Sequence, residues 1–201
     1  MKYIFLAGAP GSKWSMVARS IYSSASLDCS DQHAGRQYEK QGKVSHVGAY
    51  WDPGMEFGND FDRLSIYTKQ ECEARFDEPF SGTGVRLIKS HVFCHHLDFL
   101  RYTWPDCPII LAERDDDACL GWWVRAGGFD IEYPDYAPYY KNHAVMAREI
   151  DRQNADLRAF RHRQRAPMVA DNKHACLLLG IDQPREYFNY LTQDVRVNVI
   201  V

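Results

Sequence analysis

The sequence predicts an α/β fold of three layers, in which a mainly parallel sheet lies between helices on its two faces. Short apolar runs begin at Lys2, Val85 and Pro108, and each is followed by a segment with helical spacing of apolar residues. This alternation of strand and helix favours a parallel sheet. A chain of 201 residues, 45% apolar and 25% charged, suits a single domain spanning residues 1–201.

The N-terminal segment predicts a strand, a glycine-containing turn and a helix. The apolar run from Lys2 ends at Gly8, which is typical of a buried strand. Apolar and small residues then recur at helical spacing and predict a helix over 13–24. The stretch 25–83 is rich in Gly, Asp and aromatic residues. Loops are expected there, and such a long irregular stretch is often functional.

The remaining elements follow from the same patterns. Within 25–83 we expect a short strand at 44–49, a turn at Tyr50-Trp51-Asp52-Pro53-Gly54 and a helix at 69–76. Beyond it, strands are expected at 85–91, 108–113 and 167–170, with an edge strand at 195–201. Helices are expected at 94–102, from Asp116, at 139–163 and at 172–179, the last ending at Gly180.

The net charge of −3 gives no global basic field that would draw the protein to nucleic acid or to an anionic membrane. No apolar run approaches the roughly 20 residues of a membrane-spanning helix, and no signal peptide is evident. The six cysteines form no CxxC pair. We therefore expect reduced thiols, no membrane span, no nucleic-acid partner and a cytoplasmic location.

The turn after the first strand, Gly8 to Ser15, is the strongest candidate for a phosphate-binding loop. Backbone N–H groups at a helix start favour anions. The serines of this turn add hydroxyl groups, and Lys13 adds a full charge. The ATP-binding pattern G-x-x-x-x-G-K-[ST] is not met, because Lys13 and Trp14 stand where it requires Gly and Lys. An anion cradle fits the residues better than an ATPase loop, with a plain βα turn as the alternative.

Polar residues follow the second and third predicted strands at their carboxyl ends, where open α/β sheets bind ligands. Lys89 and His91 are spaced to share one side of a strand. A histidine can take a proton from a hydroxyl, and a lysine can offset charge on a transferring group. Arg114 offers a planar fork for phosphate. The alternatives are a buried structural histidine and an Arg114 paired with Glu113 or with the run 115–117.

Together these segments resemble the sulfotransferases that use 3′-phosphoadenosine 5′-phosphosulfate (PAPS). The family's loop commonly reads P-K-S-G-T-T-W. Pro10-Gly11-Ser12-Lys13-Trp14-Ser15 matches it in kind at Pro10, Ser12 and Ser15, with the lysine two places later. The family's catalytic strand reads I-K-T-H, and Ile88-Lys89-Ser90-His91 matches it closely. The resemblance implies a P-loop-like fold.

The third motif of the family begins at Pro-Asp and continues through a strand to an arginine. Pro105-Asp106 and Arg114-Asp115 fit this pattern, and Trp122 stands where the family has a serine. Leu179-Gly180 resembles a late L-G element. The Arg-Lys-Gly segment of cytosolic members has no clear counterpart.

The resemblance implies sulfuryl transfer from PAPS to an acceptor hydroxyl, without a metal. His91 would be the general base, and Lys89 and Lys13 would offset developing charge. The loop residues Pro10 to Ser15, with Lys13, would hold the phosphosulfate, and Arg114 would hold the 3′-phosphate. The expected acceptor is a small molecule, sugar or lipid. The chain is short for the family, which leaves room for a homo-oligomer in which a partner subunit completes the acceptor region.

Other functions stay open at this stage. A P-loop small-molecule kinase would use ATP-Mg²⁺, with metal ligands from Asp115 to Asp117. A non-catalytic nucleotide-binding relative would explain the altered loop. A zinc site at Cys94-His95-His96 is disfavoured, because adjacent helical residues diverge. Aromatic residues that could line an acceptor pocket are Tyr50, Trp51, Trp122, Trp123, Tyr133, Tyr136, Tyr139 and Tyr140.

Overall fold

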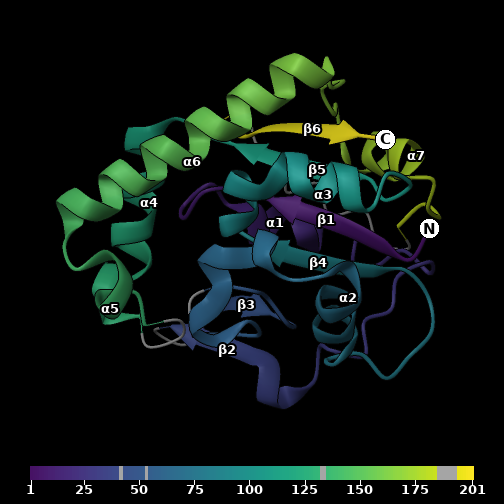
Figure 1. The fold of residues 1–201 in the computed structure, drawn as a ribbon, viewed down its shortest axis with the longest axis horizontal. Coiled ribbons are helices and arrows are strands. Elements are labelled where there is room, and N and C mark those ends of the chain that lie inside the picture. The colour runs from purple at the N-terminus through teal and green to yellow at the C-terminus, as the bar shows by residue number, and fades with distance from the viewer. Residues whose placement is uncertain (41–42, 53, 132–134, 185–193) are drawn as a thin grey trace.

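The computed structural model describes residues 1–40, 43–52, 54–131, 135–184 and 194–201. The central sheet has four strands in the order β4 (Arg86–Ser90), β1 (Tyr3–Ala7), β5 (Ile109–Glu113) and β6 (Arg196–Ile200). Strand β1 is parallel to both β4 and β5, whereas β6 runs antiparallel to β5 at the edge (Figure 1). The predicted α/β class with a mainly parallel sheet is therefore confirmed.

Helices and a small second sheet surround these strands. The helices are α1 (Trp14–Arg19), α2 (Lys69–Asp77), α3 (Leu97–Thr103), α4 (Asp116–Ala126), α5 (Ala137–Tyr140), α6 (His143–Gln164) and α7 (Asn172–Leu179). Short 3₁₀ segments are η1 (Ala34–Arg36), η2 (Gly58–Ile66), η3 (Val92–His96) and η4 (Gly128–Asp130). Strands β2 (Gln37–Lys40) and β3 (Lys43–Val47) form an antiparallel pair. Figure 1 shows this pair beyond the β4 side of the sheet.

The side chains of β1 alternate between two cores. Phe5 packs with residues of α2, α3 and α6 on one face, and Leu6 packs with residues of α1 and α7 on the other. Both side chains are fully buried. Because successive strand residues point to opposite faces, the apolar run of β1 is covered by helices on both sides.

Side-chain caps explain where several helices begin. Asp115, Asn142 and Asp171 accept from backbone N–H groups in the first turns of α4, α6 and α7. Thr68 and Glu71 form a capping box at the start of α2. Each such cap satisfies N–H groups that the helix itself leaves without an acceptor and contributes about 1 kcal/mol.

Several predicted elements differ in extent from the observed ones. The helix expected at 139–163 is divided into α5 and α6, and the helix expected at 94–102 begins as the 3₁₀ segment η3. Helix α1 ends at Arg19 rather than near Ser24, and 3₁₀-type bonds such as Ser24 N–H to the Ile21 carbonyl follow it. Ser20 donates its hydroxyl back to the Met16 carbonyl at 3.2 Å, a local bond that competes with helix propagation. The predicted strand at 167–170 is reduced to an isolated bridge between Met168 and Asn198.

All six cysteines are free thiols. Burial raises the pKa of the Cys176 thiol to about 11, so this thiol stays protonated at neutral pH. Among the residues that the structure describes, no helix has the length and apolarity needed to cross a bilayer.

Candidate functional site

The loop between β1 and α1 is held tightly against α4. Gly11 has φ of 80°, and a Cβ added there would lie 1.9 Å from the Cys119 carbonyl oxygen. Gly11 is thus required by the close packing of the loop on the α4 backbone. A glycine in a phosphate-binding loop lets the backbone approach the phosphate closely, but the close approach of Gly11 in this structure is to the backbone of Cys119.

The other loop residues take different environments. Pro10 and Ser12 are buried, and the Ser12 hydroxyl oxygen has no hydrogen-bond partner among the described residues. Trp14 and Ser15 form the start of α1 and are half-buried, and the Trp14 ring packs against His46 with centroids 5.0 Å apart. The residues predicted to bind phosphate therefore do not share one environment: Pro10 and Ser12 are buried, whereas Trp14 and Ser15 are partly exposed.

Lys13 and Arg114 come from distant segments and bind one carboxylate. The Lys13 ammonium lies 3.0 Å from Asp194 Oδ2, and the Arg114 Nη2 lies 2.6 Å from the same oxygen. Lys13 has left-handed backbone angles, with φ of 63°, which is uncommon for a residue with a side chain. Arg114 Nη1 also donates to the Gly11 carbonyl at 3.2 Å. Lys13 and Arg114, which the sequence predicted to bind an anionic cofactor, thus both bind a carboxylate of the protein itself.

Trp122 lies beside both cations. Its ring centroid is 5.0 Å from the Lys13 ammonium and 5.8 Å from the Arg114 guanidinium, within the range of cation–π attraction. Arg125 lies 5.6 Å from the same ring. The position where the resembling family has a serine is therefore adjacent to Lys13 and Arg114 here, but it offers an aromatic face in place of a hydroxyl.

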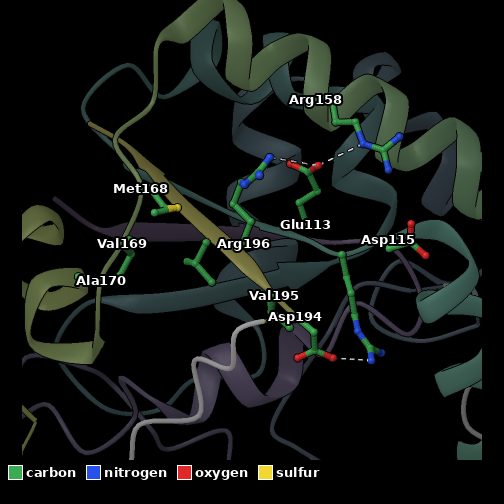
Figure 2. A pocket seen from close by; sticks show the side chains of 11 residues that line it. Glu113, Asp115, Arg158, Met168, Val169, Ala170, Asp194, Val195 and Arg196 are labelled. Carbon is green, nitrogen blue, oxygen red and sulfur yellow. Dashed lines mark hydrogen bonds and ion pairs between the residues drawn. The ribbon is translucent and has the colours of Figure 1, made fainter.

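A cavity of about 570 Å³ opens beside Arg114 and Asp194 (Figure 2). Its wall includes the end of β5, the start of β6, the segment 168–170 and Arg158 of α6. This is the carboxyl end of β5, where ligands bind in open α/β sheets. The cavity is lined by charged residues and also by apolar ones such as Met168 and Val195.

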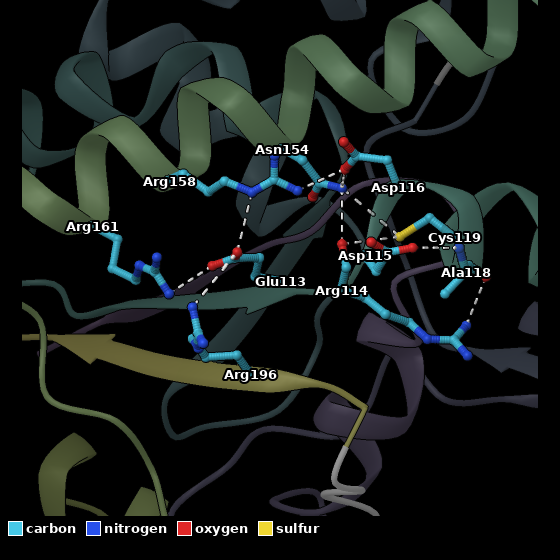
Figure 3. A network of polar contacts seen from close by, with 10 residues as sticks. All are labelled: Glu113, Arg114, Asp115, Asp116, Ala118, Cys119, Asn154, Arg158, Arg161 and Arg196. Carbon is cyan, nitrogen blue, oxygen red and sulfur yellow. Dashed lines mark hydrogen bonds and ion pairs between the residues drawn. The ribbon is translucent and has the colours of Figure 1, made fainter.

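Glu113 lines the same cavity and forms a charge network with arginines of α6 and β6 (Figure 3). Its carboxylate lies 3.1 Å from Arg158 Nε, 2.7 Å from Arg161 Nη1 and 3.8 Å from Arg196 Nη1. Glu113 therefore has its own partners. The alternative in which Arg114 pairs with Glu113 is wrong, since Arg114 pairs with Asp194.

The acidic run 115–117 begins helix α4. Asp115 accepts from the Ala118 N–H at 3.1 Å as an N-cap, and Asp116 lies 2.7 Å from Arg158 Nη2. These protein partners account for both carboxylates. Within the described ranges, no three His, Cys, Asp or Glu side chains are grouped so that they could hold a metal ion.

Lys89 is fully buried on the α1 face of the sheet, in register with Leu6. Its ammonium donates to the Val47 carbonyl at 2.9 Å and to the Tyr22 hydroxyl. Burial lowers the Lys89 pKa to about 8, a shift that the carboxylate of Asp31 opposes.

His91 is also fully buried, but its partners lie elsewhere. Its φ of −72° and ψ of −28° are helical, because β4 has ended at Ser90 and η3 follows. The strand alternation that predicted Lys89 and His91 on one side does not extend to His91. Its Nδ1 lies 3.0 Å from Gln153 Nε2 in α6. Burial lowers the His91 pKa to about 3, so the ring is neutral at pH 7.

Aromatic rings pack against His91. The centroids of Tyr136 and Tyr140 lie 5.9 and 6.2 Å from that of the imidazole. Contact between His91 and an acceptor hydroxyl therefore requires groups packed around the imidazole, these rings among them, to move.

Asp52 is a partner of His91 that the sequence did not single out. Its Oδ1 accepts the His91 backbone N–H at 3.0 Å and lies 3.5 Å from His91 Nε2. Burial raises the Asp52 pKa to about 7, against the lowering effect of the bond from the His91 backbone. The only sequence signal was its place in the turn Tyr50–Gly54. Asp194, two residues before the start of β6, was also missed.

The other residues that the sequence suggested for an acceptor pocket or a zinc site lie in several different environments. Trp51 and Trp123 belong to buried clusters, and Tyr50 packs against His46 with centroids 4.0 Å apart. Tyr139 is partly buried against the core, and Tyr133 lies outside the described residues. Cys94 is buried in the core, whereas His95 binds Glu149 and Asp156.

Comparisons with protein-family models, with curated proteins and with solved structures gave no match. The class that the structure itself defines is an α/β protein with a mainly parallel sheet and an anion-holding pair of cations beyond the carboxyl ends of β1 and β5.

Proposed function

We propose that this protein binds PAPS and transfers its sulfuryl group to the hydroxyl of a small molecule, sugar or lipid. The observation that most supports this is the convergence of Lys13 and Arg114 on the Asp194 carboxylate. Charge-assisted donors that hold a carboxylate also suit phosphate or sulfate, and arginine matches these planar or tetrahedral anions with paired N–H groups.

In this proposal the fold is P-loop-like, and the loop after β1 and Lys13 hold the phosphosulfate group. Arg114 holds the 3′-phosphate, and the cavity beside it receives part of the nucleotide. Trp122 adds an aromatic face next to both cations. Lysine and arginine supply the countercharge, so the transfer requires no metal ion.

In this proposal the acceptor hydroxyl binds near the pair formed by His91 and Asp52. Lys89 lies near the end of β4, two residues before His91. The acceptor proton passes to this pair as the hydroxyl oxygen attacks sulfur. Lys89 offsets charge that develops on the transferring group. As in phosphoryl transfer, most of the rate enhancement comes from positioning and electrostatic stabilisation.

Nucleotide binding gives the first test. Calorimetric titration with adenosine 3′,5′-bisphosphate should show binding by the wild-type protein and at least about tenfold weaker binding by Arg114→Gln. Arg163→Gln is the matched control, because Arg163 pairs with Asp98 at the surface. This variant should bind the bisphosphate as the wild-type protein does. Binding of ATP-Mg²⁺ in place of the bisphosphate would indicate the kinase alternative.

Turnover gives the second test. With PAPS and a panel of hydroxyl acceptors, His91→Ala should abolish transfer and leave bisphosphate binding nearly unchanged. Wild-type turnover in this variant would exclude His91 from the reaction. Bisphosphate binding without transfer to any acceptor in the wild-type protein would favour a non-catalytic nucleotide-binding relative.

A further inference from the structure

A chain of buried polar groups connects His91 to the carboxylate of Glu149. The Nε2 of Gln153 lies 3.0 Å from His91 Nδ1 and 3.0 Å from Glu149 Oε1. Gln153 and His91 are both fully buried. Because water does not reach these atoms, the neighbouring protein groups decide which nitrogen of the imidazole carries the proton.

Glu149 fixes the orientation of the Gln153 amide. Its Oε1 lies 2.7 Å from His95 Nε2, and its Oε2 accepts from Arg152 at 3.2 Å. Burial alone would raise the Glu149 pKa, but the hydrogen bond from His95 is the largest of the interactions that lower this pKa to about 2, and the charges of His95 and Arg152 act in the same direction. An ionised carboxylate has only acceptor oxygens. The Gln153 amide must therefore turn its NH₂ group, not its carbonyl oxygen, toward Glu149.

The same NH₂ group faces His91. An amide nitrogen has two hydrogens and no acceptor capacity, so one hydrogen points to Glu149 and the other to His91 Nδ1. The Nδ1 atom must then be the unprotonated nitrogen, and in a neutral imidazole the proton is on Nε2. We propose that Glu149 and Gln153 hold His91 as the neutral tautomer protonated on Nε2, which makes Asp52 the proton-accepting member of the His91–Asp52 pair.

The geometry around Asp52 fits this assignment. The His91 Nε2 lies 3.5 Å from Asp52 Oδ1, which also accepts the His91 backbone N–H. Among the described residues Nε2 has no hydrogen-bond partner, so the Asp52 carboxylate is the acceptor beside a proton on this nitrogen. The other oxygen, Oδ2, is buried and has no hydrogen-bond partner within the described part of the chain. Asp52 therefore has a carboxylate oxygen ready to accept a proton, whereas the lone pair of His91 Nδ1 is already bound by Gln153.

The consequence for chemistry rests on the proposed function. The acceptor hydroxyl gives its proton to Asp52 Oδ2, and its oxygen forms the new bond to sulfur. The bond from sulfur to the bridging phosphate oxygen breaks, and adenosine 3′,5′-bisphosphate leaves with that electron pair. His91 contributes an Nε2–H donor beside the carboxylate and acts as a positioning residue. The role of general base, given to His91 by the family resemblance, passes to Asp52.

The tautomer can be measured directly by two-bond ¹H–¹⁵N correlation NMR of the ¹⁵N-labelled full chain at pH 7. His91→Gln identifies the His91 ring signals by their disappearance. The expected wild-type pattern is a single neutral tautomer protonated on Nε2. A ring protonated on Nδ1, or on both nitrogens, overturns the proposal, and this measurement requires no nucleotide or acceptor.

A matched pair of variants tests the cause. Glu149→Gln removes the charge that orients Gln153, so the His91 pattern should change to include the Nδ1–H form. Asp156→Asn removes the other partner of His95 without touching Gln153, and should leave the pattern unchanged. An unchanged pattern in Glu149→Gln overturns the role of Glu149. If this variant does not fold, Gln153→Leu replaces it with the same expectation.

Turnover separates this inference from the proposed function. Asp52→Asn should lower the rate of sulfuryl transfer by about a hundredfold or more and leave the affinity for adenosine 3′,5′-bisphosphate within twofold of the wild type. Near-normal transfer in Asp52→Asn overturns the role of Asp52 as base. Absence of transfer in the wild-type protein counts against the proposed function, while the tautomer result stands independently.

Discussion

Arg114 donates a hydrogen bond to Asp194 at 2.6 Å from a guanidinium that is only 7% exposed, whereas the Asp194 side chain is 44% exposed. Lys13 binds the same carboxylate at 3.0 Å. The cations are thus fixed in the protein and the carboxylate lies at the surface. An anionic ligand that uses Lys13 and Arg114 has to compete with Asp194.

Replacement of Asp194 by Asn should therefore strengthen anion binding. The variant keeps the size of the side chain and removes the competing charge, so the affinity for adenosine 3′,5′-bisphosphate should rise about tenfold, or about 1.4 kcal/mol. Calorimetric titration at two salt concentrations measures this. Asp182→Asn is the control, since Asp182 accepts a hydrogen bond from Ser26 rather than from Lys13 or Arg114. Weaker binding in Asp194→Asn would mean that Asp194 orients the cations for the ligand.

Substitution of Gly11 by Ala should destabilise the protein strongly. The new Cβ would overlap the Cys119 carbonyl oxygen, and φ of 80° is unfavourable for alanine. We expect a loss of about 3 kcal/mol in the free energy of unfolding, measured by urea denaturation. Gly58→Ala is the control, because Gly58 also has positive φ but no atoms near its Cβ position. It should cost only about 1 kcal/mol, and equal losses would contradict the packing argument.

His91 should make stability depend on acid pH. Its pKa is lowered from 6.5 to about 3 by burial, so the unfolded chain binds the proton more readily than the folded one. The stabilising contribution is complete above pH 6.5 and is lost progressively as pH falls toward 3. Relative to His91→Gln, the wild-type protein should lose about 3 kcal/mol between pH 7 and pH 4. Parallel stability curves for the two proteins would show that His91 is solvated.

Glu113 should matter more for stability than a surface ion pair. Glu113→Gln leaves Arg158 and Arg161 without their shared carboxylate, and all three side chains are at least half-buried. We expect a loss of about 2 kcal/mol in unfolding free energy. Asp98→Asn, which breaks the exposed pair with Arg163, should cost less than about 0.5 kcal/mol. Similar small losses in both variants would mean that the Glu113 network is solvent-screened.

Local sequence patterns predicted most of the secondary structure, because the signals lie in neighbouring residues. The apolar runs became β1, β4 and β5, and the C-terminal run became the antiparallel edge strand β6. Helix α7 ends at Gly180 as expected, with that glycine in the left-handed conformation. The patterns failed where local and tertiary preferences compete, as in the shortened α1 and the isolated bridge at Met168.

The residues of the candidate site also fall into those that local sequence patterns predicted and those that only tertiary packing revealed. The sequence by itself determined that Lys89 lies near the end of a strand of a parallel sheet and that Lys13, His91 and Arg114 come after such strands, because strand periodicity and turn residues can be recognised along the chain. Only the tertiary structure decided that Asp194 binds Lys13 and Arg114, and that Asp52 and Gln153 face His91. These partners come from distant segments that packing brings together. Burial, which also depends on packing, moved the pKa values of His91, Asp52 and Lys89.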